Sequence, residues 1–316
     1  MEVVRHPSFR SLVERLWPPV TAADLVRGVL GSRPQLSRAA DGLLSPHEVG
    51  LLLRPATRRG TDERWTRGDV ALVDEAQWLV AGVPRTYSHV IVDEVQDLSP
   101  MELRMIGRRA STGAMTLLGD LAQSIAGWSY GRCDDLLGHL PAAAANRGRV
   151  ETLTVGYRVP SQLIRMAVRL LPDIAPDLEP PVAIREGEEP RFVRAPSGRL
   201  IPEVVAAMRD AASRDGSVGV IVPEPLRHAV EGGARAGRIE FDGADWGRGR
   251  KITVMSAREA KGLEFDHVLL VEPADLAAEG LRGRRELYVA LTRATKTLTV
   301  VHARDLPREL TEEAAA

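Results

Sequence analysis

Lysine is almost absent from this chain, although basic residues are common. Of its 42 lysine and arginine residues, only three are lysines, namely Lys251, Lys261 and Lys296. A phosphate-binding loop of the form Gly-x-x-x-x-Gly-Lys-[Ser/Thr] requires a lysine directly after a glycine. Each of the three lysines follows a residue other than glycine. The sequence therefore excludes this loop, which cradles the phosphates of a bound nucleotide.

Cysteine, long apolar runs and an excess of basic charge are also missing. Cys133 is the only cysteine, so an internal disulfide is excluded. No run of about 18 apolar residues occurs, and the first 17 residues contain no signal-peptide core. The net charge is −1, whereas strong nucleic-acid binders usually have a basic excess. We expect a reducing, cytoplasmic location without a membrane segment.

The first 85 residues are expected to form a helical segment. Apolar residues recur at helical spacing over residues 9–16, and Trp17 with the two prolines after it would end that helix. Thr21 can cap a helix over residues 22–30. A serine followed by Pro-His-Glu at residues 45–48 predicts a capping box.

The hydrophobic pattern changes after Tyr87. Residues 90–92 (Val-Ile-Val) predict a buried strand, residues 101–109 a helix and residues 115–118 a second strand. A strand, a helix and a strand at this spacing form a βαβ unit, which implies parallel strands.

A second α/β block is predicted after a connection at residues 141–150. Its strands are expected at residues 151–155, 191–194, 218–222, 251–255, 267–271 and 297–302. Its helices are expected at residues 161–171, 202–214, 225–232 and 284–294. Loops are expected at residues 172–181 and 187–190.

The most informative motif runs from His89 to Pro100 and reads His-Val-Ile-Val-Asp-Glu-Val-Gln-Asp-Leu-Ser-Pro. Asp93 would lie at the carboxyl end of a strand, where ligands bind in parallel α/β sheets and where a carboxylate can hold Mg²⁺. Glu94 could orient and deprotonate a water for attack on a phosphate. An Asp-Glu pair after a strand is also a common surface feature, so the motif alone leaves both interpretations open.

A second acidic pair, Asp74-Glu75, also follows apolar residues. The apolar residues around it are spaced as on one face of a helix, and Asp69 could cap that helix. We therefore assign Asp74 and Glu75 a structural role.

Four further segments follow the first acidic pair in order. They are Gly119-Asp120-Leu121-Ala122-Gln123-Ser124, Gly156-Tyr157-Arg158-Val159-Pro160, Ala260-Lys261-Gly262-Leu263-Glu264-Phe265-Asp266 and Tyr288-Val289-Ala290-Leu291-Thr292-Arg293-Ala294. With Asp93-Glu94 they resemble motifs II to VI of superfamily 1 helicases of the UvrD/Rep class. Within that class the chain most resembles the HelD family, helicase-like ATPases that act on bacterial RNA polymerase. The resemblance runs from about residue 54 to residue 302.

The resemblance implies a catalytic role for five residues. Asp93 would hold Mg²⁺ and Glu94 would activate the attacking water. Gln123 would sense the γ-phosphate. Arg158 and Arg293 would act as arginine fingers, a role that suits a planar guanidinium able to bind phosphate through two parallel hydrogen bonds.

Further matching residues are expected to line the nucleotide site. Gln96 and Asp97 would link the acidic pair to neighbouring motifs, and Asp120 would lie beside them. Glu264 would accept hydrogen bonds from the ribose, with Gly262 letting the backbone come close. ATP and Mg²⁺ are the implied ligands and RNA polymerase is the implied partner, with DNA or RNA as the alternative.

The resemblance also predicts the fold class and the domains. The expected fold is α/β, with two RecA-like parallel-sheet domains, the first of them incomplete, preceded by a helical segment. The expected boundaries are 1–85 for a helical part of an inserted or clamp region, 86–150 for the first domain, 151–305 for the second and 306–316 for a tail.

Three departures from the UvrD pattern favour a HelD-like factor over a processive DNA helicase. Ala126 stands where UvrD-type proteins place an aromatic ring that stacks on a DNA base, a contact worth about 1–3 kcal/mol. Trp128 could replace that ring or could be a packing anchor. Arg258 stands where that class has histidine. The span from Arg158 to Lys261 leaves no room for the large 2B insertion.

The phosphate loop and the adenine-contacting motif of this class lie N-terminal to motif II, and HelD proteins also carry their polymerase-entering arm there. Neither is found before Asp93. We therefore expect the chain to be the C-terminal part of a longer protein, from a truncated, split or misannotated reading frame, with the loop on the missing N-terminal half. Alone, it should bind ATP weakly and not hydrolyse it. The alternatives are a UvrD-type helicase in DNA repair or recombination, and a non-catalytic, truncated binding module.

Overall fold

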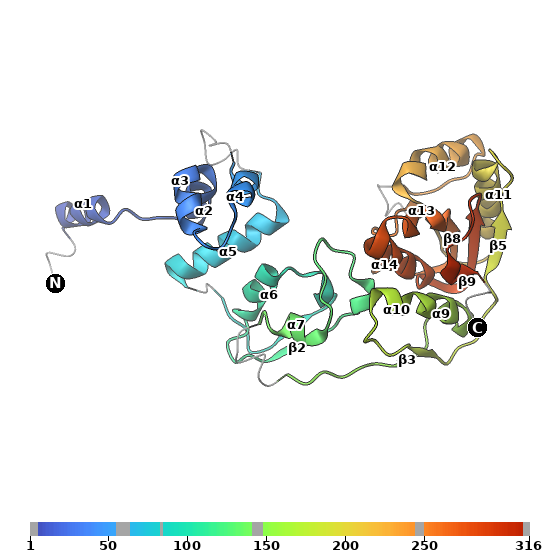
Figure 1. Cartoon of the computed structure of the whole chain (residues 1–316), viewed down its shortest axis with the longest axis horizontal. Helices are drawn as coiled ribbons and strands as arrows, with labels where there is room; N and C mark the ends of the chain where they lie inside the picture. Colours follow the sequence, from blue (N-terminus) through green and yellow to red (C-terminus); the bar gives the residue numbers. More distant parts are fainter. Residues whose placement is uncertain (1–5, 55–63, 83–84, 141–147, 244–249, 312–316) are drawn as a thin grey trace. The chain divides into compact units, whose positions relative to one another are not determined.

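The computed structural model describes residues 6–54, 64–82, 85–140, 148–243 and 250–311. The chain divides into two compact units (Figure 1). The first unit comprises residues 1–93, 98–118 and 136–148. The second comprises residues 94–97, 119–135 and 149–316. The domain boundaries expected from the sequence stay a prediction.

Helices dominate the first unit. They are α1 (Pro7–Leu16), α2 (Ala22–Gly31), α3 (Arg33–Ala39), α4 (Pro46–Leu52), α5 (Arg67–Ala81) and α6 (Pro100–Gly107). Two predicted caps are confirmed, because Thr21 accepts a hydrogen bond from the N–H of Asp24 and Ser45 forms a capping box with Glu48. Four of the helices enclose a small apolar core whose members include Val26, Leu30, Leu36, Val49 and Ala76. Among the described residues, every helix of the chain is too short or too polar to span a bilayer.

The N-terminal cap of α5 differs from the prediction. Thr66, and not Asp69, is the capping residue, and Asp69 completes a capping box from the third helical position. Asp69 is buried and also accepts two hydrogen bonds from the guanidinium of Arg54, at 2.9 and 2.7 Å. Because carboxylates in the first helical turn interact favourably with the helix dipole, Asp69 stabilises both the helix start and the segment before it.

The βαβ unit predicted after Tyr87 is confirmed in the first unit. β1 (Val90–Val92) and β2 (Met115–Leu117) pair in parallel, with Val90 opposite Met115, and α6 lies between them in the chain. The short 3₁₀ helices η3 (Val95–Asp97) and η4 (Leu121–Gln123) follow the two strands, and both belong to the second unit.

A five-stranded parallel sheet forms the centre of the second unit, and its strand order is β5-β9-β8-β6-β7 (Figure 1). Its strands are β5 (Arg191–Arg194), β6 (Val218–Ile221), β7 (Ile252–Met255), β8 (Phe265–Val271) and β9 (Ala294–His302). Among the described residues, the remaining helices are α7 (Cys133–Leu137), α9 (Ser161–Ala167), η5 (Val168–Leu170), α10 (Leu171–Ile174), α11 (Leu200–Ser213), α12 (Glu224–Ala236), α13 (Pro273–Ala277), α14 (Gly280–Leu291) and η6 (Arg308–Leu310). The fold class is therefore α/β with parallel sheets, consistent with RecA-like domains.

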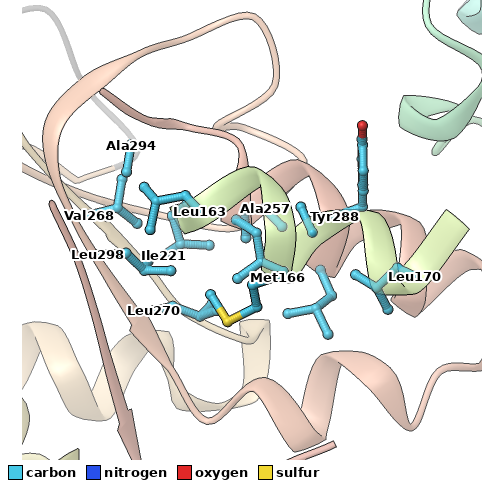
Figure 2. Close-up of a cluster of buried hydrophobic side chains, with 14 of the residues drawn as sticks. Leu163, Met166, Leu170, Ile221, Ala257, Val268, Leu270, Tyr288, Ala294 and Leu298 are labelled. Atoms are coloured by element: carbon cyan, nitrogen blue, oxygen red, sulfur yellow. The ribbon is translucent and has the colours of Figure 1, made fainter. Parts of the chain in front are cut away.

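Helices cover both faces of this sheet, as all-parallel sheets require. Val268 and Leu270 of β8 point to the face that α9 and α14 cover, whereas Leu269 and Val271 point to the face that α11 and α12 cover. Figure 2 shows the first of these cores, with Leu163 and Met166 of α9 packed among the strand side chains. The ring of Tyr288 lies at the edge of this core (Figure 2). The sheet thereby supplies a rigid platform for the loops at its ends.

Some predicted elements are wrong in extent. Residues 151–154 are not a strand, and only β3 (Val155–Gly156) pairs in parallel with β4 (Val182–Ala183), in a separate two-stranded sheet. The helix predicted over residues 161–171 is divided into α9, η5 and α10. The last of these extends into the predicted loop at residues 172–181.

Candidate nucleotide site

Glu94 has an unusual backbone conformation directly after β1 and Asp93. Its φ is +53°, in the left-handed region that non-glycine residues rarely adopt. Such a conformation costs about 1–3 kcal/mol and persists only where surrounding contacts hold it. One of these contacts is a hydrogen bond of 2.6 Å that the side-chain amide of Gln96 donates to Oε2 of Glu94. The acidic residue is therefore held in place by its own motif.

Gln96 joins this motif to the segment after β2. Its side chain is fully buried, and its Oε1 accepts a hydrogen bond from the backbone N–H of Asp120 at 3.1 Å. The close approach explains the glycine at position 119, because a Cβ there would lie 2.6 Å from Gln96 Oε1. The predicted link between Gln96 and the neighbouring motif is present in the geometry.

Gln123 extends the chain of hydrogen bonds. Its Nε2 donates to Oδ2 of Asp120 at 2.7 Å, and its Oε1 accepts from Nη2 of Arg293 at 2.8 Å. Asp120 also caps η4 by accepting from the N–H of Ala122 at 2.9 Å. A continuous polar path therefore runs from Glu94 through Gln96, Asp120 and Gln123 to the arginine before β9.

Arg293 is almost completely enclosed. It is 3% exposed, and besides Gln123 it donates to the carbonyl oxygens of Val289 and Leu263, at 3.2 and 3.3 Å. Burial lowers the pKa of Arg293, and the positive charge of Arg158 lowers it further. The charges of Glu94, Glu264 and Asp120 oppose this shift. Because the effective dielectric constant is low in a buried environment, the charge of Arg293 interacts strongly with any charge close to it.

Arg158 and Glu264 form an ion pair with each other. Arg158 Nη1 lies 2.7 Å from Glu264 Oε1, and the side chains are 46% and 45% exposed. Glu264 directly precedes β8 and Arg293 directly precedes β9, and the N–H of Phe265 donates to the carbonyl of Arg293 at 3.0 Å. The amino ends of two neighbouring strands thus place Glu264 and Arg293 together. Gly262, with φ of +75°, lies in the turn before Glu264.

Lys261 is a site residue that the motif assignment did not single out. Its Nζ lies 2.6 Å from Asp97 Oδ2 and 3.3 Å from Glu94 Oε2, and it donates to the backbone carbonyl of Gln123 at 2.7 Å. The sequence contained a signal for it, since Lys261 is one of three lysines and lies inside a quoted motif. Its partners lie far away in the chain, so spacing could not have identified them.

Arg285 of α14 was also missed. It is buried and donates to the backbone carbonyls of Ser124 and Ile174, at 3.3 and 3.0 Å, while burial lowers its pKa. Tyr288, one helical turn later, is buried as well, and burial together with the charge of Asp120 raises the pKa of its hydroxyl. Both side chains stabilise the loop that carries Gln123 against the second unit's core.

The other acidic pair is structural, as predicted. Asp74 and Glu75 lie within α5 and form ion pairs with three arginines at the end of α6 and just after it. Asp74 is bound by Arg108 at 2.6 Å and also pairs with Arg109, and Glu75 pairs with Arg104 at 2.9 Å. These contacts join two helices of the first unit.

The structure describes the two positions that depart from the UvrD pattern, Ala126 and Arg258, and the nearby Trp128. Ala126 is half-buried, and the indole N–H of Trp128 is buried without a hydrogen-bond partner among the described residues. Arg258 donates to Glu286 at 2.7 Å, and that glutamate is buried.

The acidic residues fit part of a magnesium–nucleotide site. Mg²⁺ is usually held by one or two carboxylates together with phosphate oxygens, and Asp93 at the end of β1 could supply one carboxylate. Among the described residues, no group of three histidine, cysteine or acidic side chains could hold a metal by itself. The donor set therefore fits Mg²⁺ only when phosphate oxygens complete it.

Comparison with protein families gives two matches. Residues 51–139 match the UvrD/REP helicase N-terminal domain, and residues 251–301 match the UvrD-like helicase C-terminal domain. The first match contains Asp93, Glu94 and Gln123, and the second contains Glu264 and Arg293. The chain therefore carries UvrD-like helicase segments of both kinds. Arg158 lies between the two matches.

Solved helicase structures are distantly similar. The C-terminal domain of a possible DNA helicase from Lactobacillus plantarum WCFS1 is 21% identical with a TM-score of 0.40, and the match covers 50% of this chain and 96% of that one. Arterivirus nonstructural protein 10, a helicase solved with DNA, is 18% identical with a TM-score of 0.38, covering 69% of this chain and 40% of that one. The chain thus spans less than half of the viral helicase. No curated protein sequence matches the chain.

Proposed function

We propose that the chain is the C-terminal, nucleotide-responsive part of a UvrD-like ATP-hydrolysing motor. The observation that carries the proposal is the hydrogen-bond path from Glu94 to Arg293, in which Gln123 contacts both Asp120 and Arg293. A glutamine that accepts a hydrogen bond from a buried arginine is suited to respond when a phosphate oxygen competes with its own oxygen for that arginine.

Each residue then has a defined task. ATP with Mg²⁺ supplies the phosphoryl group, and Asp93 is the carboxylate of this chain that would hold the metal. Glu94 orients and deprotonates the attacking water. Arg293 and Arg158 stabilise charge on the phosphate oxygens, and Arg158 must first leave Glu264. Glu264, once released, is available to the ribose hydroxyls.

Alone, the chain should not turn ATP over. It has no lysine after a glycine, so the loop that holds the β- and γ-phosphates must come from another polypeptide segment. Arg158 is engaged with Glu264 and Lys261 is engaged with the acidic motif, so neither substitutes for the loop lysine. The proposal therefore differs from that of an ATPase that is active as this chain alone.

The finer proposal is a HelD-like factor that binds RNA polymerase. It is supported by the small side chain of Ala126, where DNA-stacking helicases have a ring, and by the pairing of Arg258 with Glu286. A direct binding assay with purified partners tests it. We expect the chain to bind core RNA polymerase more tightly than single-stranded DNA at the same salt concentration. Preferential binding to DNA would favour the UvrD-type alternative, and binding to neither would favour the truncated binding module.

A gain-of-function variant sharpens this test. Ala126→Phe restores an aromatic ring at the stacking position, and a ring stacked on a base contributes about 1–3 kcal/mol. If the chain retains a DNA groove, the variant should bind single-stranded DNA about 10-fold more tightly. We expect no gain. The matched control is Ala183→Phe, which adds the same ring on β4.

A further inference from the structure

Three oxygen atoms from two segments of the second unit, residues 94–97 and the end of η4, converge on one ammonium group. The Nζ of Lys261 contacts Asp97 Oδ2 at 2.6 Å, the Gln123 carbonyl oxygen at 2.7 Å and Glu94 Oε2 at 3.3 Å. An ammonium has three N–H donors, so these three acceptors can use all of them. The side chain of Lys261 is only 9% exposed.

The turn that carries Lys261 is anchored in the core of the second unit. Lys261 lies in the turn between β7 and β8, where its N–H donates to the carbonyl of Arg258 at 3.3 Å. Ala257 and Ala260, two residues of the same turn, are completely buried in the hydrophobic core of the second unit. This anchoring restricts the position of the Lys261 ammonium.

The acceptors are those of a hard-cation site. Carboxylate and backbone carbonyl oxygens are the ligands that Ca²⁺, Mn²⁺ and Mg²⁺ prefer. The distances from Nζ, 2.6 to 3.3 Å, lie at or above the upper end of the roughly 2.0–2.6 Å range of metal–oxygen bonds, as expected for an ammonium in the same place. Two carboxylates and a carbonyl directed at one point would repel one another without a positive charge between them.

We propose that Lys261 is a tethered cation that occupies a latent divalent-metal site formed by Glu94, Asp97 and the Gln123 carbonyl. In this position its single charge offsets part of the charge of the two carboxylates. The side chain also joins the motif V turn to motifs II and III and excludes metal ions from this point. The inference goes beyond the proposed function, and it requires neither ATP nor hydrolysis.

Metal titration of neutral variants tests the proposal. Mn²⁺ is titrated into wild-type chain and Lys261→Met, and free Mn²⁺ is followed by electron paramagnetic resonance. Removing the positive charge from the point where a dication would bind should strengthen binding at least about 10-fold. We expect Lys261→Met to gain one Mn²⁺ site that wild type lacks, and Lys261→Met with Asp97→Asn to lose it again. Lys296→Met, which removes an ion-paired lysine elsewhere, should gain none.

Two further variants control for the charge of the side chain and for misfolding of Lys261→Met. Lys261→Arg keeps the charge, so it should exclude Mn²⁺ as wild type does. Lys261→Gln keeps amide donors for the carboxylates and replaces Lys261→Met if that variant does not fold. Equal Mn²⁺ binding by wild type and a folded neutral variant, or a gain that survives Asp97→Asn, would overturn the proposal.

Discussion

The side-chain oxygen of Gln123 accepts a hydrogen bond of 2.8 Å from Arg293, 170 residues further along the chain. The contact joins the last residue of η4 to the residue that directly precedes β9. It also divides the two predicted arginine fingers into different classes, because Arg293 is enclosed and bound several times, whereas Arg158 is half-exposed and bound by Glu264.

The two arginines should therefore differ in their contribution to stability. Arg293→Ala leaves buried carbonyl and amide oxygens without a donor, and we expect it to lower the free energy of unfolding by about 2–4 kcal/mol. Arg158→Ala removes a solvent-exposed ion pair and should cost less than about 1 kcal/mol. Urea unfolding followed by circular dichroism measures both. Equal losses would show that Arg293 is not held as described.

Activity requires a subtler substitution at the buried position. Arg293→Lys keeps the charge but loses the planar guanidinium. With the phosphate-loop half supplied in trans or by fusion, we expect this variant to lower ATP turnover by about 10³-fold, as for other arginine fingers. Arg191→Lys, on the exposed strand β5, is the control with unchanged turnover. Unchanged turnover in Arg293→Lys would remove Arg293 from the site.

The close approach at Gly119 predicts a coupled pair. A Cβ at this position meets Gln96 Oε1 at 2.6 Å and Val95 Cγ1 at 2.9 Å, so Gly119→Ala should destabilise the chain by about 1–3 kcal/mol. Shortening the opposing side chain relieves part of this clash. The double variant with Gln96→Ala should therefore lose less stability than the sum of the single variants.

Gly127→Ala is the matched control for this cycle. Nothing lies within 4 Å of a Cβ at that position, and its stability should be close to that of wild type. Strict additivity of Gly119→Ala and Gln96→Ala in chemical denaturation would contradict the contact between motifs II and III.

Asp266 should give the chain an acid-dependent stability. Lys296 at 2.9 Å and the N–H of Ser217 at 2.8 Å lower the pKa of Asp266 from 3.8 to about 2. A carboxyl whose folded pKa is depressed stabilises the protein above its unfolded pKa, and this contribution disappears as the pH falls toward the folded value. The affected window is therefore about pH 4 to 2.

Substitution isolates this contribution. Asp266→Asn should lower stability at pH 6 and should lose less additional stability than wild type between pH 4 and 2. Unfolding free energies from urea titrations at several pH values give both curves. Parallel curves for the two proteins would exclude Asp266 as a source of the acid sensitivity.

Local sequence signals predicted much of the fold. Thr21 and Ser45 cap helices as expected, and β-branched runs became the central strands, because burial on both faces leaves few alternatives. The strand predicted at residues 151–155 is wrong in extent, because a strand requires a paired neighbour and, of that range, only Val155 pairs with another strand. The strand propensity of a segment does not show whether another strand will pair with it.

The candidate site was predictable in part, for a similar reason. The order of the motifs predicted that Glu94, Gln123 and Arg293 belong to one site. In the structure, hydrogen bonds through Gln96 and Asp120 connect these three residues. The position of the Lys261 ammonium between two carboxylates depends on contacts across more than a hundred residues. No local pattern encodes such contacts.

ATP hydrolysis by the purified chain tests the central claim most directly. The claim is that Glu94 and its partners form the water-activating half of a UvrD-like site whose phosphate loop lies elsewhere. Steady-state phosphate release is measured at saturating Mg²⁺ and ATP for wild type and for Glu94→Gln. We predict that neither protein releases phosphate above the uncatalysed background. Robust turnover by wild type that Glu94→Gln abolishes would contradict the account.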